Sequence, residues 1–261
     1  MLSPSVELRV AIGQTLMHWT IEGNLSEMRS AMHVAKREGA DLCVFPELAV
    51  PGFHREIVNL AKPDLIANAV QVLQAESAKL SLATAFGAPT FGESAIRNSY
   101  VLLASSGEQV AAIHKNGLTD PEATFFTRGS DRPVTNLCGL QTSAVICREV
   151  EDLDHVCLQL QHRQVELLLW PGQMRPDPEK PATDLPEHIA QARALAARLN
   201  AYVVQANWPN ALNRPSESAD TGHSAVIEPT GSLAFRAPKA QPGVAVFTLG
   251  DRQCSWFASE A

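Results

Sequence analysis

The chain has 261 residues, of which 45% are hydrophobic and 19% are charged, and its formal net charge is −7 at pH 7. A globular chain of this length buries about three quarters of its unfolded surface, so it needs no disulfides or metal to fold. The acidic balance argues against nucleic acid as the main partner and provides no basic patch for a membrane surface. Because the composition does not shift along the sequence, we expect a single domain over residues 1–261.

The cysteines argue against a disulfide framework and against a bound metal. They number five, which is odd, and no two stand at C-x-x-C spacing: Cys43, Cys138, Cys147, Cys157 and Cys254. We therefore expect no metal or other cofactor, and a reducing cytoplasm as the compartment. We expect no signal peptide, because the first residues lack its basic and apolar regions. We also expect no transmembrane helix, because no window approaches 18 consecutive apolar residues.

The first half of the chain alternates between strand and helix patterns. Residues 7–15 change from alternating to fully apolar, which is typical of a strand. Asn24 and Glu27 resemble a capping box, with Asn24 as N-cap, and apolar residues follow at helical spacing. Residues 41–45 form a short apolar strand, which predicts a βαβ unit with parallel strands. Further predicted elements are a helix over 65–80, a strand over 82–88, and the hairpin strands 100–104 and 109–114.

The second half repeats this alternation and brings the total to about ten strands and four or five helices. We expect a loop over 119–132 and a strand over 140–146 that runs into Cys147. Next come a helix over 153–160, a buried strand over 165–170 and a proline-rich surface loop over 175–186. The last predicted elements are a helix over 187–199, a strand over 202–206, the hairpin strands 224–228 and 232–237, and a strand over 244–249.

Cys147 is the first candidate for a functional residue because it ends a buried strand and charged residues follow it directly. In open α/β sheets that edge is where ligands bind. A free thiol has a pKa of about 8.5, so a nucleophilic cysteine needs a base or a positive neighbour. Glu47 and Lys115 stand just beyond two other predicted strands and could serve. By itself, however, a cysteine at a strand end is more often a buried core residue.

Six segments in the same order resemble the motifs of the nitrilase, or carbon–nitrogen hydrolase, superfamily. They are V-F-P-E-L at 44–48, K-N-G-L at 115–118, E-A-T-F-F-T-R-G at 122–129, I-C-R-E at 146–149, R-A-L-A-A-R-L-N-A-Y-V-V at 193–204 and G-H-S-A-V-I-E-P-T-G at 222–231. The resemblance covers residues 10 to about 249. It implies an α/β fold of the nitrilase type, a four-layer α-β-β-α sandwich.

The resemblance also implies a mechanism and a site. Cys147 would attack a nonpeptide C–N bond, usually that of an amide, and form a thioester. Glu47 would act as general base and acid, and Lys115 would stabilise the oxyanion together with the backbone N–H of Arg148. Glu122 would support Lys115. The expected partner is a small-molecule substrate: a linear amide, an ω-amide or a carbamoyl compound.

Two alternatives stay open at this point. The thioester could pass to an amine instead of water, which would make the protein an acyl or amide transferase. The chain could also be a non-catalytic member that binds a metabolite or a partner protein. Retention of Glu47, Lys115 and Cys147 together favours an enzyme over such a binding protein.

Three residues are candidates for substrate binding: Arg148, Trp170 and Gln173. A guanidinium next to the nucleophile can bind a carboxylate through two parallel hydrogen bonds, which predicts a preference for amides that also carry a carboxylate. The alternative is that Arg148 pairs with Glu149 or Glu151 and never contacts substrate. Trp170 and Gln173 lie at the end of a predicted strand, where they would line the mouth of the pocket.

The resemblance implies a homodimer or a higher homo-oligomer. We expect the contact to involve residues 149–161, which follow Cys147. This segment carries Val156, Leu158 and Leu160, more apolar surface than a solvent-facing helix would leave exposed.

Three departures from the family pattern bear on which substrate is expected more than on the fold. They are Arg148 itself, Asp152-Leu-Asp-His155 in place of a second F-P-E, and Ala197-Arg198 where the family has Glu before Asn.

Overall fold

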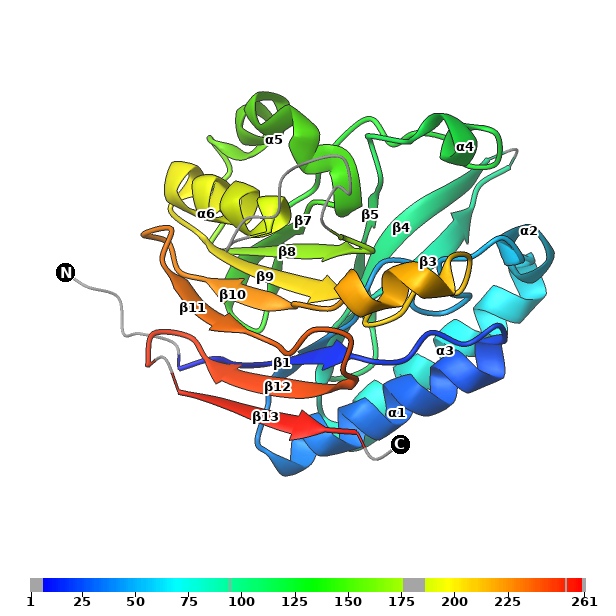
Figure 1. Ribbon diagram of the computed structural model, residues 1–261, viewed down its shortest axis with the longest axis horizontal. Helices are drawn as coiled ribbons and strands as arrows, with labels where there is room; N and C mark the ends of the chain where they lie inside the picture. Colours follow the sequence, from blue (N-terminus) through cyan, green and yellow to red (C-terminus); the bar gives the residue numbers. More distant parts are fainter. Residues whose placement is uncertain (1–6, 94, 176–185, 252, 260–261) are drawn as a thin grey trace.

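The computed structural model describes residues 7–93, 95–175, 186–251 and 253–259. Two mixed β-sheets stacked face to face form the centre of the molecule (Figure 1). The first has the order β13-β12-β1-β2-β3-β4-β5, with strands Cys254–Ala258, Gly243–Thr248, Arg9–Gln14, Leu42–Val44, Ala83–Phe91, Ile96–Leu103 and Gln109–His114. The second has the order β11-β10-β9-β8-β7-β6, with strands Leu233–Arg236, Ala225–Ile227, Tyr202–Asn207, Leu167–Gly172, Leu140–Ala144 and Thr135–Leu137.

Each sheet has three parallel strands at its centre and antiparallel strands at its edges. The parallel sets are β1-β2-β3 and β7-β8-β9. Strands that are covered on both faces read as continuous apolar runs, and successive side chains point to opposite faces. In β1, Val10 and Ile12 face the second sheet, and Ala11 faces the helices. The carboxyl ends of the strands in each parallel set lie at the same edge; Glu47 follows β2 and Cys147 follows β7.

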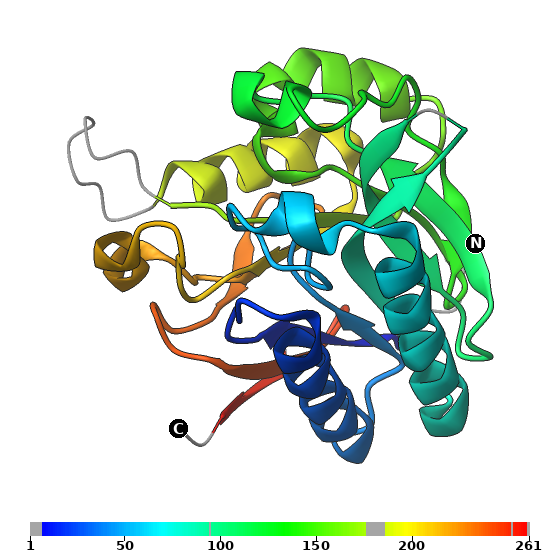
Figure 2. The same ribbon diagram turned by 90° about the vertical axis from the view of Figure 1, so that its right-hand side faces the viewer.

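Helices cover the outer face of each sheet, which gives four layers (Figure 2). Helices α1 (Ile21–Arg37) and α3 (Pro63–Leu80) pack on the first sheet, and α5 (Leu153–Leu160) and α6 (Glu187–Leu199) pack on the second. The predicted α-β-β-α sandwich is therefore confirmed. Short helices α2 (Ile57–Leu60) and α4 (Asp120–Ala123) and the 3₁₀ helices η1 (Cys147–Asp152) and η2 (Pro215–Asp220) lie in the connections.

The predicted cap of the first helix is wrong. The helix begins one turn earlier, and Thr20 is the N-cap, with a side-chain oxygen that accepts a hydrogen bond from the Gly23 N–H. Asn24 is buried inside the helix, where its amide accepts from the His18 N–H and donates to the Val50 carbonyl. Its side chain therefore joins two loops at the sheet edge instead of capping the helix.

Several other elements differ from the sequence-based expectation. Strand β4 begins at Ile96, four residues before the predicted start, and the edge strands β6 and β13 are additional. Helix α4 lies within the predicted loop 119–132. The described residues contain thirteen strands, six α-helices and two 3₁₀ helices, more than expected. The predicted surface loop over 175–186 lies outside the described residues except at its two ends.

Helix α5 exposes less apolar surface than the sequence suggests. Val156 and Leu160 are buried against α6, and Leu158 is 64% exposed. Two of the three apolar residues behind the expected dimer contact therefore belong to the core of this chain, and the oligomeric state stays a prediction. Among the described residues, no helix combines the length and the apolar character that crossing a membrane requires.

Candidate active site

Glu47, Lys115 and Cys147 each follow the carboxyl end of a strand. Glu47 comes after β2, Lys115 directly after β5 in the same sheet, and Cys147 after β7 in the opposite sheet. The Lys115 ammonium donates hydrogen bonds to Oε1 of Glu47 at 2.7 Å and to Oε1 of Glu122 at 2.6 Å. Lys115 and Glu47 are both fully buried. The structure therefore brings together the lysine and the two carboxylates that the sequence singles out.

Hydrogen bonds hold the backbone and one carboxylate oxygen of Glu47 in place. Its Oε1 also accepts from Nδ2 of Asn98 at 2.7 Å, and its backbone carbonyl accepts from Nε1 of Trp208 at 2.9 Å. Gly87 of β3 lets the neighbouring strand approach, because a Cβ there would clash with the Glu47 and Leu48 backbone. Oε2 of Glu47 is buried and has no hydrogen-bond partner among the described residues, so a basic oxygen is available for a reacting proton.

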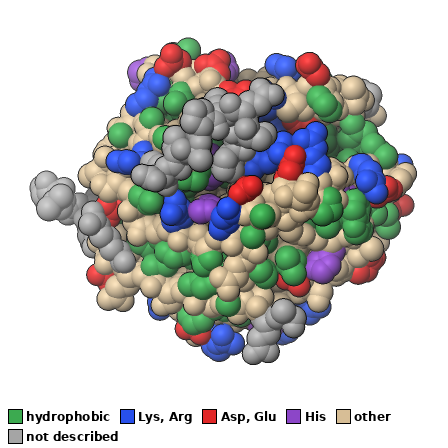
Figure 3. All heavy atoms as spheres, viewed as in Figure 1, with side chains coloured by type: hydrophobic (Ala, Val, Ile, Leu, Met, Phe, Trp, Pro, Cys, Tyr) green, Lys and Arg blue, Asp and Glu red, His purple; other side chains and the backbone are tan. Residues whose placement is uncertain are grey.

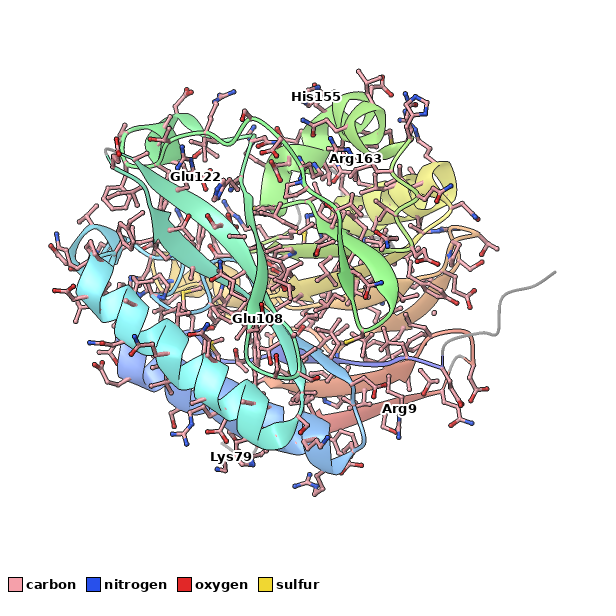
Figure 4. All side chains as sticks on the ribbon, turned by 180° about the vertical axis from the view of Figure 1, so that it is seen from behind. Arg9, Lys79, Glu108, Glu122, His155 and Arg163 are labelled. Carbon is pink, nitrogen blue, oxygen red and sulfur yellow. The ribbon has the colours of Figure 1, made fainter. Side chains whose placement is uncertain are left out.

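Glu122 is positioned by the first turn of α4. Thr119 caps this helix by accepting from the Glu122 N–H at 3.1 Å, and Oε2 of Glu122 accepts from the Thr119 N–H at 2.9 Å. Its Oε1 is thereby left for Lys115, with Asn98 Nδ2 at 3.4 Å. Figure 4 labels Glu122, which belongs to α4. Leu118 and Phe126, which stand before and after α4 in the chain, pack together with Leu48.

A buried ion pair between Arg132 and Glu149 joins the residues after Lys115 to the turn at Cys147. Oε1 of Glu149 accepts from the backbone N–H groups of Asn116 and Gly117, and its Oε2 accepts from the Ile146 N–H. The Arg132 guanidinium donates to both oxygens of this carboxylate, at 3.1 and 3.2 Å, and both side chains are almost completely buried. Glu149 therefore fixes the residues on either side of the site relative to each other.

Cys147 adopts a backbone conformation that non-glycine residues rarely adopt, with φ of 53°. Its carbonyl accepts a hydrogen bond from Nε1 of Trp170 at 2.8 Å. Gly172 of β8 packs close enough that a Cβ there would lie 3.3 Å from Cα of Cys147. Strain of this kind is found at functional sites where the surroundings determine the conformation. Here it turns the chain sharply from β7 into η1.

The protonation states at the site are set by burial and by mutual charge. Burial raises the pKa of Glu47, and the Lys115 charge opposes that shift. Burial alone would lower the pKa of Lys115, but Glu47, Cys147 and Glu122 together raise it above its ordinary value. Burial, followed by the charge of Glu47, raises the pKa of the Cys147 thiol to about 12, against the opposing effects of Lys115 and the Gln173 N–H. At neutral pH the resting site therefore holds a protonated thiol and a charged lysine.

A cavity of about 310 Å³ opens at Cys147. Its lining includes all three predicted substrate-binding residues, Arg148, Trp170 and Gln173. The Arg148 guanidinium is paired with the Glu151 carboxylate, with Nε at 3.2 Å from Oε2, and both side chains are about half exposed. This pairing is the alternative that the sequence left open for Arg148. Trp170 is buried, and its indole supports the cysteine backbone.

Sequence reasoning missed four residues that organise the site: Asn98, Arg132, Glu149 as an ion-pair partner, and Trp208. The signal for Glu149 was its place two residues after Cys147, but its partners Arg132, Gly117 and Asn116 lie 17 to 33 positions away along the chain. Among the described residues, no group of three or more His, Cys, Asp or Glu side chains is arranged to hold a metal ion.

The fold is shared with proteins of known structure. The structure is similar to that of a double mutant of the amidase from Nesterenkonia sp. AN1 in complex with acrylamide, with a TM-score of 0.82 and 21% identity, over 96% of this chain and 94% of that one. It is also similar to the glutamine-dependent NAD⁺ synthetase from Acinetobacter baumannii, with a TM-score of 0.79 and 22% identity, over 98% of this chain and 48% of that one.

In sequence, the chain is 25% identical over 236 residues to the glutamine-dependent NAD⁺ synthetase of Acinetobacter baylyi. The match covers 88% of this chain and 42% of that relative, so the chain spans less than half of the relative's length. The fold is that of nitrilase-type amidases. The sequence model of the carbon–nitrogen hydrolase family matches residues 9–253, and the chain therefore belongs to the carbon–nitrogen hydrolase family.

Proposed function

We propose that this protein hydrolyses small primary amides through a thioester on Cys147, with Glu47 as general base and acid and Lys115 as the oxyanion donor. The observation that carries the proposal is the buried Lys115 ammonium. It is bonded to two carboxylates, and its charge and that of Glu47 both act on the Cys147 thiol. A buried cation with this much surrounding negative charge stays protonated, as an oxyanion donor requires.

In the acylation step, the sulfur of Cys147 attacks the amide carbon while the thiol proton passes to Glu47. The transfer accompanies the attack, because a thiol with a pKa of about 12 does not ionise beforehand at neutral pH. Oε2 of Glu47 is the unpaired oxygen that accepts the proton. Lys115 and the backbone N–H of Arg148 stabilise the negative charge on the carbonyl oxygen.

Collapse of the tetrahedral intermediate breaks the C–N bond and leaves the acyl group on Cys147. Glu47 returns its proton to the leaving nitrogen, which departs as ammonia. A water molecule then attacks the thioester, and Glu47 takes a proton from this water. Release of the carboxylic acid gives the proton back to Cys147, so the enzyme is regenerated with no net change.

The comparisons support an amide as substrate. The Nesterenkonia amidase was studied in complex with acrylamide and butyramide, which are primary amides. The related NAD⁺ synthetases are glutamine-dependent, and glutamine carries a primary carboxamide. Acyl transfer to an amine uses the same thioester and is the competing proposal.

Ammonia release from butyramide tests hydrolysis, and acid quenching during turnover followed by peptide mass spectrometry tests the thioester. We expect ammonia and butyrate in equal amounts and a butyryl group on the peptide that contains Cys147. Added hydroxylamine distinguishes the two reactions: a transferase forms the hydroxamate in preference to the acid. The absence of ammonia and of an adduct across a panel of short primary amides would refute the proposal.

A further inference from the structure

The cavity at Cys147 extends to the first turn of α6, where His188 lines its wall. His188 is 7% exposed, and within the part of the chain that the structure describes neither of its ring nitrogens has a hydrogen-bond partner. A neutral imidazole carries one N–H donor and one lone-pair acceptor, and buried polar groups of this kind are normally paired. An unpaired, buried imidazole in the wall of a cavity that also holds the nucleophile therefore points to a ligand group that it binds.

His188 is held firmly in this position. Its backbone carbonyl accepts a hydrogen bond from Nε2 of Gln205 at 3.1 Å, which joins the start of α6 to β9. Ile189, the next residue, is fully buried in the core between α6 and the second sheet. These contacts fix the backbone of residue 188 beside the cavity that its side chain lines.

The imidazole is uncharged at neutral pH. Burial, followed by the electrostatic effects of His223 and Arg236, lowers the pKa of His188 to about 4. The ring therefore offers a neutral donor or acceptor, and its tautomer can follow the group that it meets. An uncharged ring of this kind suits a hydroxyl, carbonyl or carboxamide better than a carboxylate.

The two arginines in the cavity lining are already paired. Arg148 is bonded to Glu151, and Arg175 forms a salt bridge with Glu217. Basic and acidic side chains are also interspersed on the face shown in Figure 3. The described lining therefore holds compensated positive charge, which gives a neutral substrate the advantage over an anionic one.

We propose that His188 is a specificity-determining residue, and that its imidazole binds an uncharged hydrogen-bonding group, such as a second carboxamide, that the substrate carries beyond the reacting amide. This proposal rests on the hydrolysis proposed above. Its substrate class is that of short primary amides with a second neutral polar group, as opposed to purely aliphatic amides or amides with a carboxylate.

Three probes of equal chain length test the proposal: hexanamide, glutaramide and glutaramic acid. Their distal ends are apolar, neutral polar and anionic, respectively. We expect the wild type to have its highest kcat/KM on glutaramide. The His188→Leu variant should lose about fivefold or more on glutaramide and little on hexanamide, because one neutral hydrogen bond is removed from one substrate only. His188→Gln, which keeps a donor and an acceptor, should restore part of the preference.

His155→Leu is the matched control, because it removes an exposed imidazole of α5 (Figure 4) that is not among the described residues that line the cavity. It should leave the ratio of glutaramide to hexanamide turnover unchanged. Equal losses on both amides in His188→Leu would show a structural role and overturn the proposal. A wild-type preference for hexanamide or for glutaramic acid would overturn it as well.

Binding to the Cys147→Ala variant separates this proposal from the proposed reaction, because binding needs no turnover. If the wild type hydrolyses none of the amides but Cys147→Ala binds glutaramide more tightly than hexanamide, and adding His188→Leu removes that difference, the reaction fails and the role of His188 stands. If hydrolysis occurs without discrimination, the role of His188 fails and the reaction stands. The absence of both binding and turnover overturns both.

Discussion

Replacing Arg132 by Met tests whether the buried ion pair holds the site together. The guanidinium donates to both oxygens of Glu149 and to the Ala144 carbonyl, and its side chain is 1% exposed. Breaking a buried pair by removing one partner typically costs about 3–5 kcal/mol, because the remaining charge is buried and uncompensated. We therefore expect Arg132→Met to lower the free energy of unfolding by about that amount.

Arg148→Met is the matched control, because it removes the same side chain from a pair with a glutamate. The side chains of Arg148 and Glu151 are 45% and 57% exposed, and surface pairs of this kind contribute about 0–1 kcal/mol. Urea denaturation followed by circular dichroism measures both variants. Equal losses in the two variants, or a loss below about 1 kcal/mol in Arg132→Met, would refute the reasoning.

Three further predictions concern the reaction and the assembly. Burial raises the pKa of Glu47 above its ordinary value of 4.5, and Glu47 must be deprotonated to act as a base. We therefore expect kcat/KM to rise with pH on the acidic side of its pH profile, with a midpoint above 4.5. A midpoint at or below 4.5 would contradict this. Arg148→Ala should lower kcat/KM for glutaramide and glutaramic acid by the same factor, since the guanidinium is paired with Glu151. A loss of about tenfold confined to glutaramic acid would instead show that Arg148 binds the carboxylate of the substrate. Leu158→Asp should weaken a dimer formed through α5, measured by light scattering over a range of concentrations, and a wild type that is monomeric throughout would remove this interface.

The layered fold could be predicted because its signals are local. Burial on both faces makes β2 and β8 continuous apolar runs, and burial of one helix face places Met28 and Met32 four residues apart. Both patterns can be read from neighbouring residues in the sequence. The edge strands β6 and β13 were missed because they are short and only partly buried. Their strand conformation depends on a neighbouring strand, which no local pattern reveals.

The predicted catalytic residues Glu47, Lys115 and Cys147 follow strand ends, where a polar residue after an apolar run is conspicuous. Asn98 was missed because it lies inside β4, whose start was placed at Tyr100. Asn24 was taken for a cap because the same side chain suits a helix start and a buried loop contact, and only burial distinguishes the two. Arg132 and Glu149 are 17 positions apart, so their pairing appears only once the chain is folded.

Ammonia release from butyramide by the Cys147→Ala variant tests the central claim most directly. Cys157→Ala is the matched control, because it removes another free thiol, one that is buried in the core between α5 and α6. The account predicts turnover in the wild type and in Cys157→Ala, and none in Cys147→Ala, whose melting temperature should be close to that of the wild type. Undiminished ammonia release from a folded Cys147→Ala protein would contradict the assignment of Cys147 as the nucleophile.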